Sequence, residues 1–100
     1  MDETKFESFL ADDTSITSKY KAVKTRLSKA RSVEKCLKTD LASIVCDDDK
    51  MYQALLSIND LMNNRNGVYS NALRKYYVFR NGYEFPMIAE DERIKKIRLF

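Results

Sequence analysis

The sequence predicts an all-α protein, a compact bundle of four to five helices. Apolar residues recur at steps of three and four along most of the chain, which is the period of one helix face. Only two glycines and one proline interrupt 100 residues, of which 44% are hydrophobic and 33% are charged. Because a chain of this length forms one hydrophobic core, we expect a single helical domain over residues 1–83, followed by an extension over residues 84–100.

Two helices are expected in the first third of the chain. The spacing of Phe6, Phe9 and Leu10 predicts a short amphipathic helix that ends near Ala11. A second helix, over residues 15–30, is predicted by apolar side chains at steps of three, four and three, namely Tyr20, Val23, Leu27 and Ala30.

Capping residues mark the helix starts in the middle of the chain. Ser32 can cap a short helix through Lys38, and Asp40 can cap the turn that carries Leu41, Ile44 and Val45. The acidic run at residues 47–49 suits the positive end of a helix dipole and lacks the spacing of a calcium loop. It therefore predicts a helix over residues 49–63, with apolar positions at Met51, Tyr52, Leu55, Ile58, Leu61 and Met62.

The last helix of the domain follows a polar break at residues 63–67. Ser70 can cap this helix, and Asn81 with Gly82 ends it, so we expect a helix over residues 70–81 that carries Ala72, Leu73, Tyr76 and Phe79. Since Tyr76 and Tyr77 are neighbours, we expect only one of them to face the core. Residues 83–86 are an extended exit, and the rest of the extension is a short terminal helix or an arm.

Several classes of protein are excluded by what the sequence lacks. It has no run of about 18 apolar residues to span a bilayer, and its acidic first residues differ from a signal peptide, so we expect a cytoplasmic protein that begins at its natural Met1 and has no membrane partner. Cys36 and Cys46 are expected to be buried, reduced thiols. Without histidine, neither the usual catalytic triads nor an ordinary zinc site can form. We therefore expect no catalytic residue, no metal and no small-molecule cofactor, and hence no enzyme.

The net charge of +3 conceals a segregated pattern. Residues 19–38 hold eight basic and one acidic side chain, a net charge of +7, and residues 61–83 hold four basic side chains and no acidic one. Residues 1–13 and residues 39–60 each carry a net charge of −4. Fields act locally within about 8–10 Å in salt, so two basic helices alternate with two acidic stretches.

The basic helices supply the candidate binding residues. Long cations beside small hydroxyl groups are typical of phosphate contacts, and asparagine and arginine can read adenine and guanine edges. Tyr69 and Tyr83 flank the second basic helix, so at least one tyrosine is expected to be exposed beside the basic residues. Packing of its ring with the hydroxyl group at the surface is favoured over base stacking or catalysis. The candidate nucleic-acid-binding residues are Lys19, Lys21, Lys24, Thr25, Ser28, Lys29, Asn71, Arg74 and Lys75.

The order of these parts is informative in itself. A short helix and a Ser/Thr-rich stretch precede a basic helix that begins SKYKAV at residues 18–23, and a later helix has the sequence YSNALRKYYVF over residues 69–79. This order resembles the SAM-like N-terminal core-binding domain of phage integrases and related tyrosine recombinases, over about residues 3–82. In that family the domain forms half of a clamp around DNA, and two helices that match residues 15–30 and 70–81 lie against the duplex. The recombinase catalytic domain has no counterpart here, so the resemblance implies DNA contact without recombination.

Two functions remain open from the sequence. The first is a non-catalytic DNA-binding module whose two basic helices contact the phosphate backbone. The second is a small interaction or inhibitor protein, of the kind that mobile elements encode, which binds a protein partner or occupies its nucleic-acid channel. The acidic stretches support the second, because they repel DNA and can imitate it.

Overall fold

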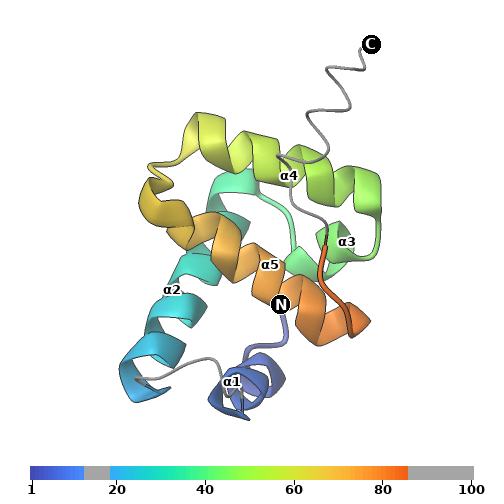
Figure 1. Ribbon diagram of the computed structural model, residues 1–100. Helices are drawn as coiled ribbons and strands as arrows, with labels where there is room; N and C mark the ends of the chain where they lie inside the picture. Colours follow the sequence, from blue (N-terminus) through green and yellow to red (C-terminus); the bar gives the residue numbers. More distant parts are fainter. Residues whose placement is uncertain (13–18, 86–100) are drawn as a thin grey trace.

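A computed structural model describes residues 1–12 and 19–85, with the side chains of Lys19, Tyr20 and Asn66 excepted. These residues form five α-helices and one 3₁₀ turn (Figure 1). The helices are α1 (Glu3–Asp12), α2 (Lys19–Leu37), α3 (Leu41–Val45), α4 (Asp48–Leu61) and α5 (Val68–Asn81), and the 3₁₀ turn η1 (Arg65–Gly67) precedes α5. The all-α bundle is therefore confirmed. The predicted terminal helix or arm falls on residues 86–100 and lies outside the described residues.

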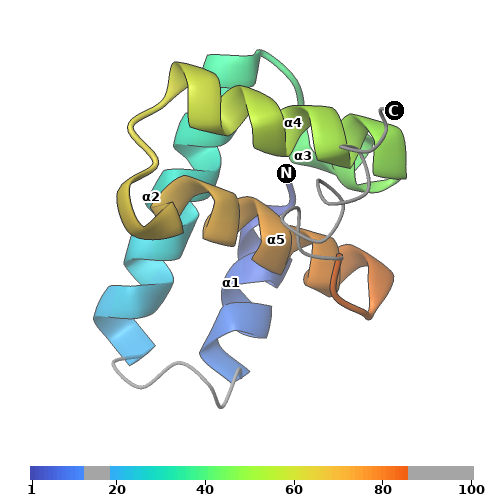
Figure 2. The same cartoon turned by 45° about the horizontal axis from the view of Figure 1, so that its top comes forward.

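The helix α5 is the centre of the bundle. It contacts each of the other four α-helices, and its packing against α2 is the most extensive between any two elements of the described chain. Figures 1 and 2 show α5 passing through the middle of the molecule, with α2 crossing it and α4 on its other side. The two basic helices of the sequence are thus direct neighbours.

The helix α2 is continuous where the sequence predicted two helices. Val23, Leu27, Ala30 and Val33 are all buried along one side, so a single apolar face extends past the expected break. Ser32 does not cap a new helix, because its hydroxyl group donates a hydrogen bond to the Ser28 carbonyl within the same helix at 3.1 Å.

The end of α2 has a left-handed residue that is not glycine. Lys38 has a φ of 55°, and the Thr39 N–H reaches back to the Glu34 carbonyl at 3.3 Å. This six-to-one hydrogen bond is that of a Schellman motif, which satisfies a terminal carbonyl of the helix. The chain can then turn directly into α3.

Two short acidic caps begin the next helices, as the sequence predicts. Asp40 accepts a hydrogen bond from the Ala42 N–H at the start of α3, and Asp47 accepts from Asp49 and Lys50 at the start of α4. On α4, Met51, Leu55 and Ile58 are buried, whereas Leu61 at the end of the same apolar row is 67% exposed.

The neighbouring tyrosines of α5 are both buried, so the expectation that only one would face the core is wrong. Tyr76 packs edge-on against Phe6 of α1, and Tyr77 packs against Phe85 on another side of the helix. Each hydroxyl group has a polar partner, since Tyr76 accepts from the Asp2 N–H at 3.1 Å and Tyr77 donates to Asp48 at 2.8 Å. A central helix can bury two faces, and these partners remove the cost of burying the hydroxyl groups.

The cysteines are free thiols, but they are not both buried as predicted. Cys46 is exposed and Cys36 is half-buried. Cys46 is the C-cap of α3 and directly follows the buried Val45, at the point where the chain turns toward solvent. Its thiol donates to the Ser43 carbonyl at 3.2 Å.

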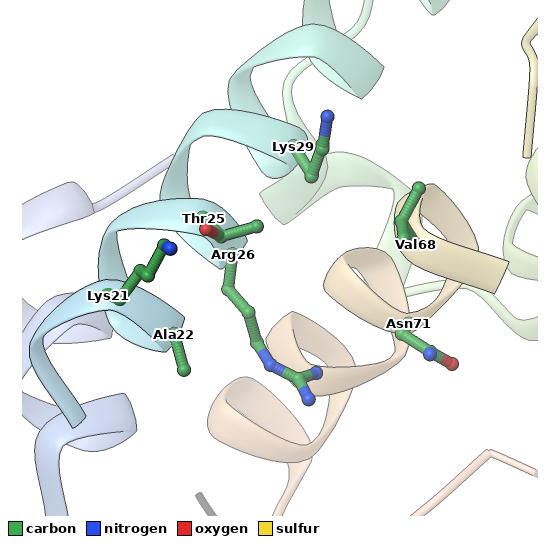
Figure 3. A pocket seen from close by; sticks show the side chains of 7 residues that line it. All are labelled: Lys21, Ala22, Thr25, Arg26, Lys29, Val68 and Asn71. Carbon is green, nitrogen blue, oxygen red and sulfur yellow. The ribbon is translucent and has the colours of Figure 1, made fainter. Parts of the chain in front are cut away.

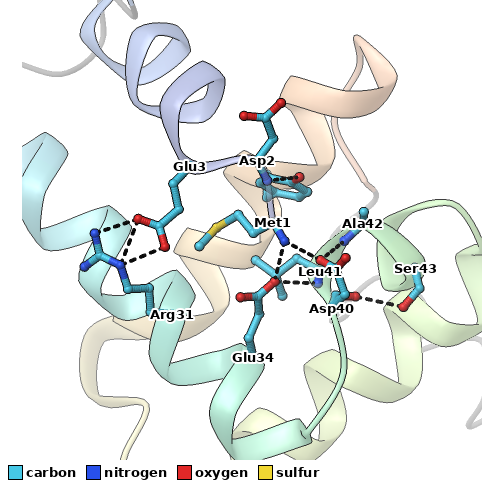
Figure 4. A network of polar contacts seen from close by, with 10 residues as sticks. Met1, Asp2, Glu3, Arg31, Glu34, Asp40, Leu41, Ala42 and Ser43 are labelled. Carbon is cyan, nitrogen blue, oxygen red and sulfur yellow. Dashed lines mark hydrogen bonds and ion pairs between the residues drawn. The ribbon is translucent and has the colours of Figure 1, made fainter.

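The first residue is held at the junction of α2 and α3 (Figure 4). The Met1 ammonium lies 3.0 Å from the Glu34 carboxylate and 2.5 Å from the Asp40 carboxylate. Glu34 also accepts a hydrogen bond from the Leu41 N–H at 3.0 Å. These contacts fix the start of the chain against the end of α2.

Candidate nucleic-acid interface

A groove of about 340 Å³ lies where α2 crosses α5 (Figure 3). One face of α2 forms the first wall, with residues in two adjacent rows at steps of four. The first turn of α5 forms the second wall, with two residues that are three positions apart. The lining residues are Lys21, Ala22, Thr25, Arg26 and Lys29 of α2 and Val68 and Asn71 of α5.

The position of the second wall depends on Asn64. Its side-chain oxygen accepts hydrogen bonds from the Tyr69 and Ser70 N–H groups at 2.9 and 3.2 Å, which are free donors in the first turn of α5. Its amide nitrogen donates to Asn59 at 2.8 Å. Asn64 therefore caps α5, and the prediction that Ser70 does so is wrong, because the helix begins two residues earlier at Val68.

All charged side chains that line the groove are basic. Three of its seven lining residues are cations, and none of the seven is acidic. Lys21 is exposed, while Arg26 and Lys29 are half-buried. In the part of the chain that the structure describes, neither Lys21 nor Arg26 takes part in an ion pair.

Lys29 joins the two walls. Its ammonium group lies 5.0 Å from the centre of the Tyr69 ring on α5, which is within the range of a cation–π contact. This contact holds a positive charge at one end of the groove and keeps a tyrosine ring beside it. Tyr69 itself is half-buried.

The acidic helix α1 neutralises a different side of α2. The Arg31 guanidinium binds the Glu3 carboxylate with two nitrogens, the shortest contact being 2.8 Å. This hydrogen bonding holds the pKa of Glu3 below its ordinary value and that of Arg31 above its own. Arg31 lies about 120° around α2 from Thr25 and does not line the groove, so this ion pair leaves the three groove cations in place.

Four of the nine predicted binding residues come together in the groove. They are Lys21, Thr25, Lys29 and Asn71. Lys24 and Ser28 are exposed on α2 but do not line the groove. Lys19 begins α2, and its side chain lies outside the described part.

The two remaining predicted residues, Arg74 and Lys75, are half-buried on α5 and lie outside the groove lining. The Arg74 guanidinium donates to the Phe85 carbonyl at 3.0 Å and lies 5.8 Å from the Phe85 ring centre. Arg74 therefore holds the segment after α5 against the bundle.

Three groove residues were not among the predicted binding residues. Arg26 belongs to the exposed cations of the basic helix but was not selected, although it lies four residues after Ala22 and three before Lys29 and therefore on the same face. Ala22 and Val68 carry no polar group that would have drawn notice. Val68 also lay outside the predicted helix, so nothing in the sequence placed it opposite α2.

No protein-family model, curated protein or solved structure matches the chain. The resemblance to recombinase core-binding domains therefore stays a prediction. Among the described residues, no three metal-ligating side chains gather into a possible metal site. None of the helices in this part of the chain is long and apolar enough to cross a membrane.

Proposed function

We propose that the protein is a non-catalytic DNA-binding module that holds the phosphate backbone in the groove between α2 and α5. The observation that carries this proposal is the composition of the groove, in which Lys21, Arg26 and Lys29 meet and no lining residue is acidic. A concave surface of one charge concentrates the field and attracts a ligand of the opposite charge. DNA is a polyanion whose phosphates a cationic groove of this kind can bind.

The neutral groups of the groove suit the same ligand. The Thr25 hydroxyl group and the Asn71 amide can donate hydrogen bonds to phosphate oxygens, as such side chains commonly do in protein–DNA contacts. Asn71 is exposed and lies in the first turn of α5. The first N–H groups of α5 already donate to Asn64 and Arg65, but the positive end of the helix dipole still adds positive potential at the same wall.

The arrangement of acidic side chains supports DNA over a protein partner. Asp47 caps α4, and Asp48 accepts the Tyr77 hydroxyl group, so both have a role within the fold. Glu3 is paired with Arg31. None of these carboxylates lines the groove. A mobile-element origin, an integrase-like ancestry and a cytoplasmic location fit a DNA-binding module and form part of the proposal.

The test is a fluorescence-anisotropy titration of a labelled duplex at about 50 and about 200 mM salt. Three phosphates neutralised by Lys21, Arg26 and Lys29 give a log–log salt slope of about −2.7. A fourfold rise in salt then weakens binding about 40-fold. Lys21→Ala or Arg26→Ala lowers the slope to about −1.8, so that the same rise in salt weakens binding only about 12-fold.

Lys35→Ala is the matched control. Lys35 is an exposed cation of the same helix that lies outside the groove, so its replacement changes the net charge equally. We expect its salt slope to equal that of the unchanged protein. No measurable affinity at low salt, or an equal loss in Lys35→Ala and Lys21→Ala, would refute the proposal.

A further inference from the structure

The groove has an apolar surface, which we call its floor, that phosphate contact does not use. Ala22 of α2 and Val68 of α5 are the half-buried hydrophobic residues of this floor. The Thr25 methyl group and the aliphatic carbons of Arg26 and Lys29 complete the lining. Against the outside of a base-paired duplex, this surface would face charged phosphates and water. Apolar surface gains free energy only when it covers other apolar surface.

We infer that the groove takes one unpaired base of the bound DNA, with the flanking phosphates on the surrounding cations. This inference rests on the proposed DNA-binding function and names the form of DNA that the groove prefers. A base has a flat, weakly polar ring surface and hydrogen-bonding groups only at its edge. It is therefore the part of DNA that fits an apolar floor within a cationic rim.

The dimensions agree with a single base. A groove of about 340 Å³ is at the small end of the range of about 300–1,000 Å³ for ligand pockets. Lys21 and Lys29 are eight residues apart on one helix, which separates them by about 12 Å along its axis. The phosphates on either side of one nucleotide are closer together than this, so the long side chains of Lys21 and Lys29 would converge on them, with Arg26 between.

The polar groups at the rim suit the edges of a base. The Asn71 amide carries both donors and an acceptor, the combination that pairs with an adenine edge. The Tyr69 ring beside Lys29 provides an aromatic surface at one end of the groove, next to the cation that holds the adjacent phosphate. Aromatic surfaces next to cations are the usual means of holding single strands.

The experiment compares a perfect duplex with the same duplex carrying a one-nucleotide bulge. The two probes have nearly equal charge, so the ratio of their affinities reports the base and not the phosphates. A single strand of the same sequence is the third probe. We expect the bulged duplex to bind about tenfold more tightly than the perfect one.

Two variants change the floor without changing charge. Ala22→Gln fills the groove with a polar side chain on a residue type that favours helices, and Val68→Thr is nearly isosteric and replaces a methyl group by a hydroxyl group. Both should bring the affinity ratio close to one. Lys21→Ala should weaken binding to both duplexes and keep the ratio, and Lys35→Ala should change neither. Thermal unfolding followed by circular dichroism checks that each variant folds.

The outcomes are distinct. An equal affinity for the bulged and perfect duplexes, or a ratio that both floor variants keep, overturns the unpaired-base inference and leaves DNA binding intact. Failure to bind any of the three probes at low salt overturns the proposed function itself. A tenfold preference that both floor variants abolish supports the inference.

Discussion

Replacing Glu34 by glutamine tests the contact that holds the first residue at the junction of α2 and α3. The Glu34 carboxylate binds the Met1 ammonium at 3.0 Å and accepts a hydrogen bond from the Leu41 N–H at 3.0 Å (Figure 4). Glutamine has nearly the same shape and keeps an oxygen for Leu41. The substitution therefore removes the ion pair and leaves the link to α3.

The stability that Glu34→Gln removes should lie between the value for an exposed ion pair and the value for a buried one. Exposed pairs contribute about 0–1 kcal/mol, and removing one partner of a buried pair costs about 3–5 kcal/mol. Glu34 is 25% exposed, and the ammonium keeps Asp40, which is 56% exposed, as a second partner. We expect Glu34→Gln to lower the free energy of unfolding by about 1–2 kcal/mol at pH 7.

The cost should depend on pH in a defined direction. Burial of the Met1 ammonium works to lower its pKa, but hydrogen bonds to Asp40 and Glu34 and their negative charges outweigh it and raise the pKa above 8.0. Because the pKa is higher in the folded state, the stabilisation is complete below about pH 8 and is lost as the pH rises through the folded value. The difference between the two proteins should therefore shrink as the pH rises above about 8.

Urea unfolding followed by circular dichroism at several pH values measures this difference. Glu3→Gln is the control, because it breaks the ion pair with Arg31, in which the two side chains are 53% and 45% exposed. That pair contributes below about 0.5 kcal/mol and should not vary between about pH 8 and pH 10. The reasoning is refuted if Glu34→Gln costs the same at both ends of this range, or no more than Glu3→Gln.

Three further predictions concern the helix ends and the core, each measured by urea unfolding. Lys38→Gly should stabilise the protein by about 1 kcal/mol, because φ is positive at this position, whereas Lys38→Ala should leave it unchanged; equal effects would contradict the left-handed assignment. Asn64→Ala should cost about 1–2 kcal/mol, since α5 loses both capping hydrogen bonds, and Ser70→Ala should cost less than half of that. Tyr77→Phe should cost about 1 kcal/mol for the lost contact with Asp48, and Tyr77→Ala about 3–5 kcal/mol; a mild effect of alanine would mean that this ring is not part of the core.

The inward faces of the helices were predictable from the sequence. Val23, Leu27 and Ala30 are buried at the expected positions, because a helix that packs on one side needs apolar residues at its own period. Asp40 and Asp47 cap the helices that they precede, which depends only on local chemistry.

The features that depend on tertiary contacts were not predictable. Tyr76 and Tyr77 are both buried because α5 has neighbours on several sides. The spacing of apolar residues predicts only one buried face for each helix, so it could not predict the burial of both tyrosines. Ser32 was expected to begin a helix, but the apolar face that continues to Val33 keeps α2 in one piece.

One wall of the candidate site was predictable from the sequence, and most of the other was not. The cations of the first wall lie in the basic stretch at residues 19–38, from which Lys21, Thr25 and Lys29 were selected. The opposite wall depends on the start of α5, which Asn64 fixes through its side chain. Val68 therefore could not be placed before the structure was known.

Because the walls of the groove come from distant parts of the chain, the site exists only when the protein is folded. Residues 21–29 and residues 68–71 meet through the packing of α2 on α5, and an unfolded chain does not hold them together. A bound ligand must therefore raise the melting temperature, by an amount that corresponds to about 2.7 kcal/mol at a free concentration 100 times its dissociation constant. A thermal-shift screen of oligonucleotides against the unlabelled protein can thus rank ligands of the groove without any assay of activity.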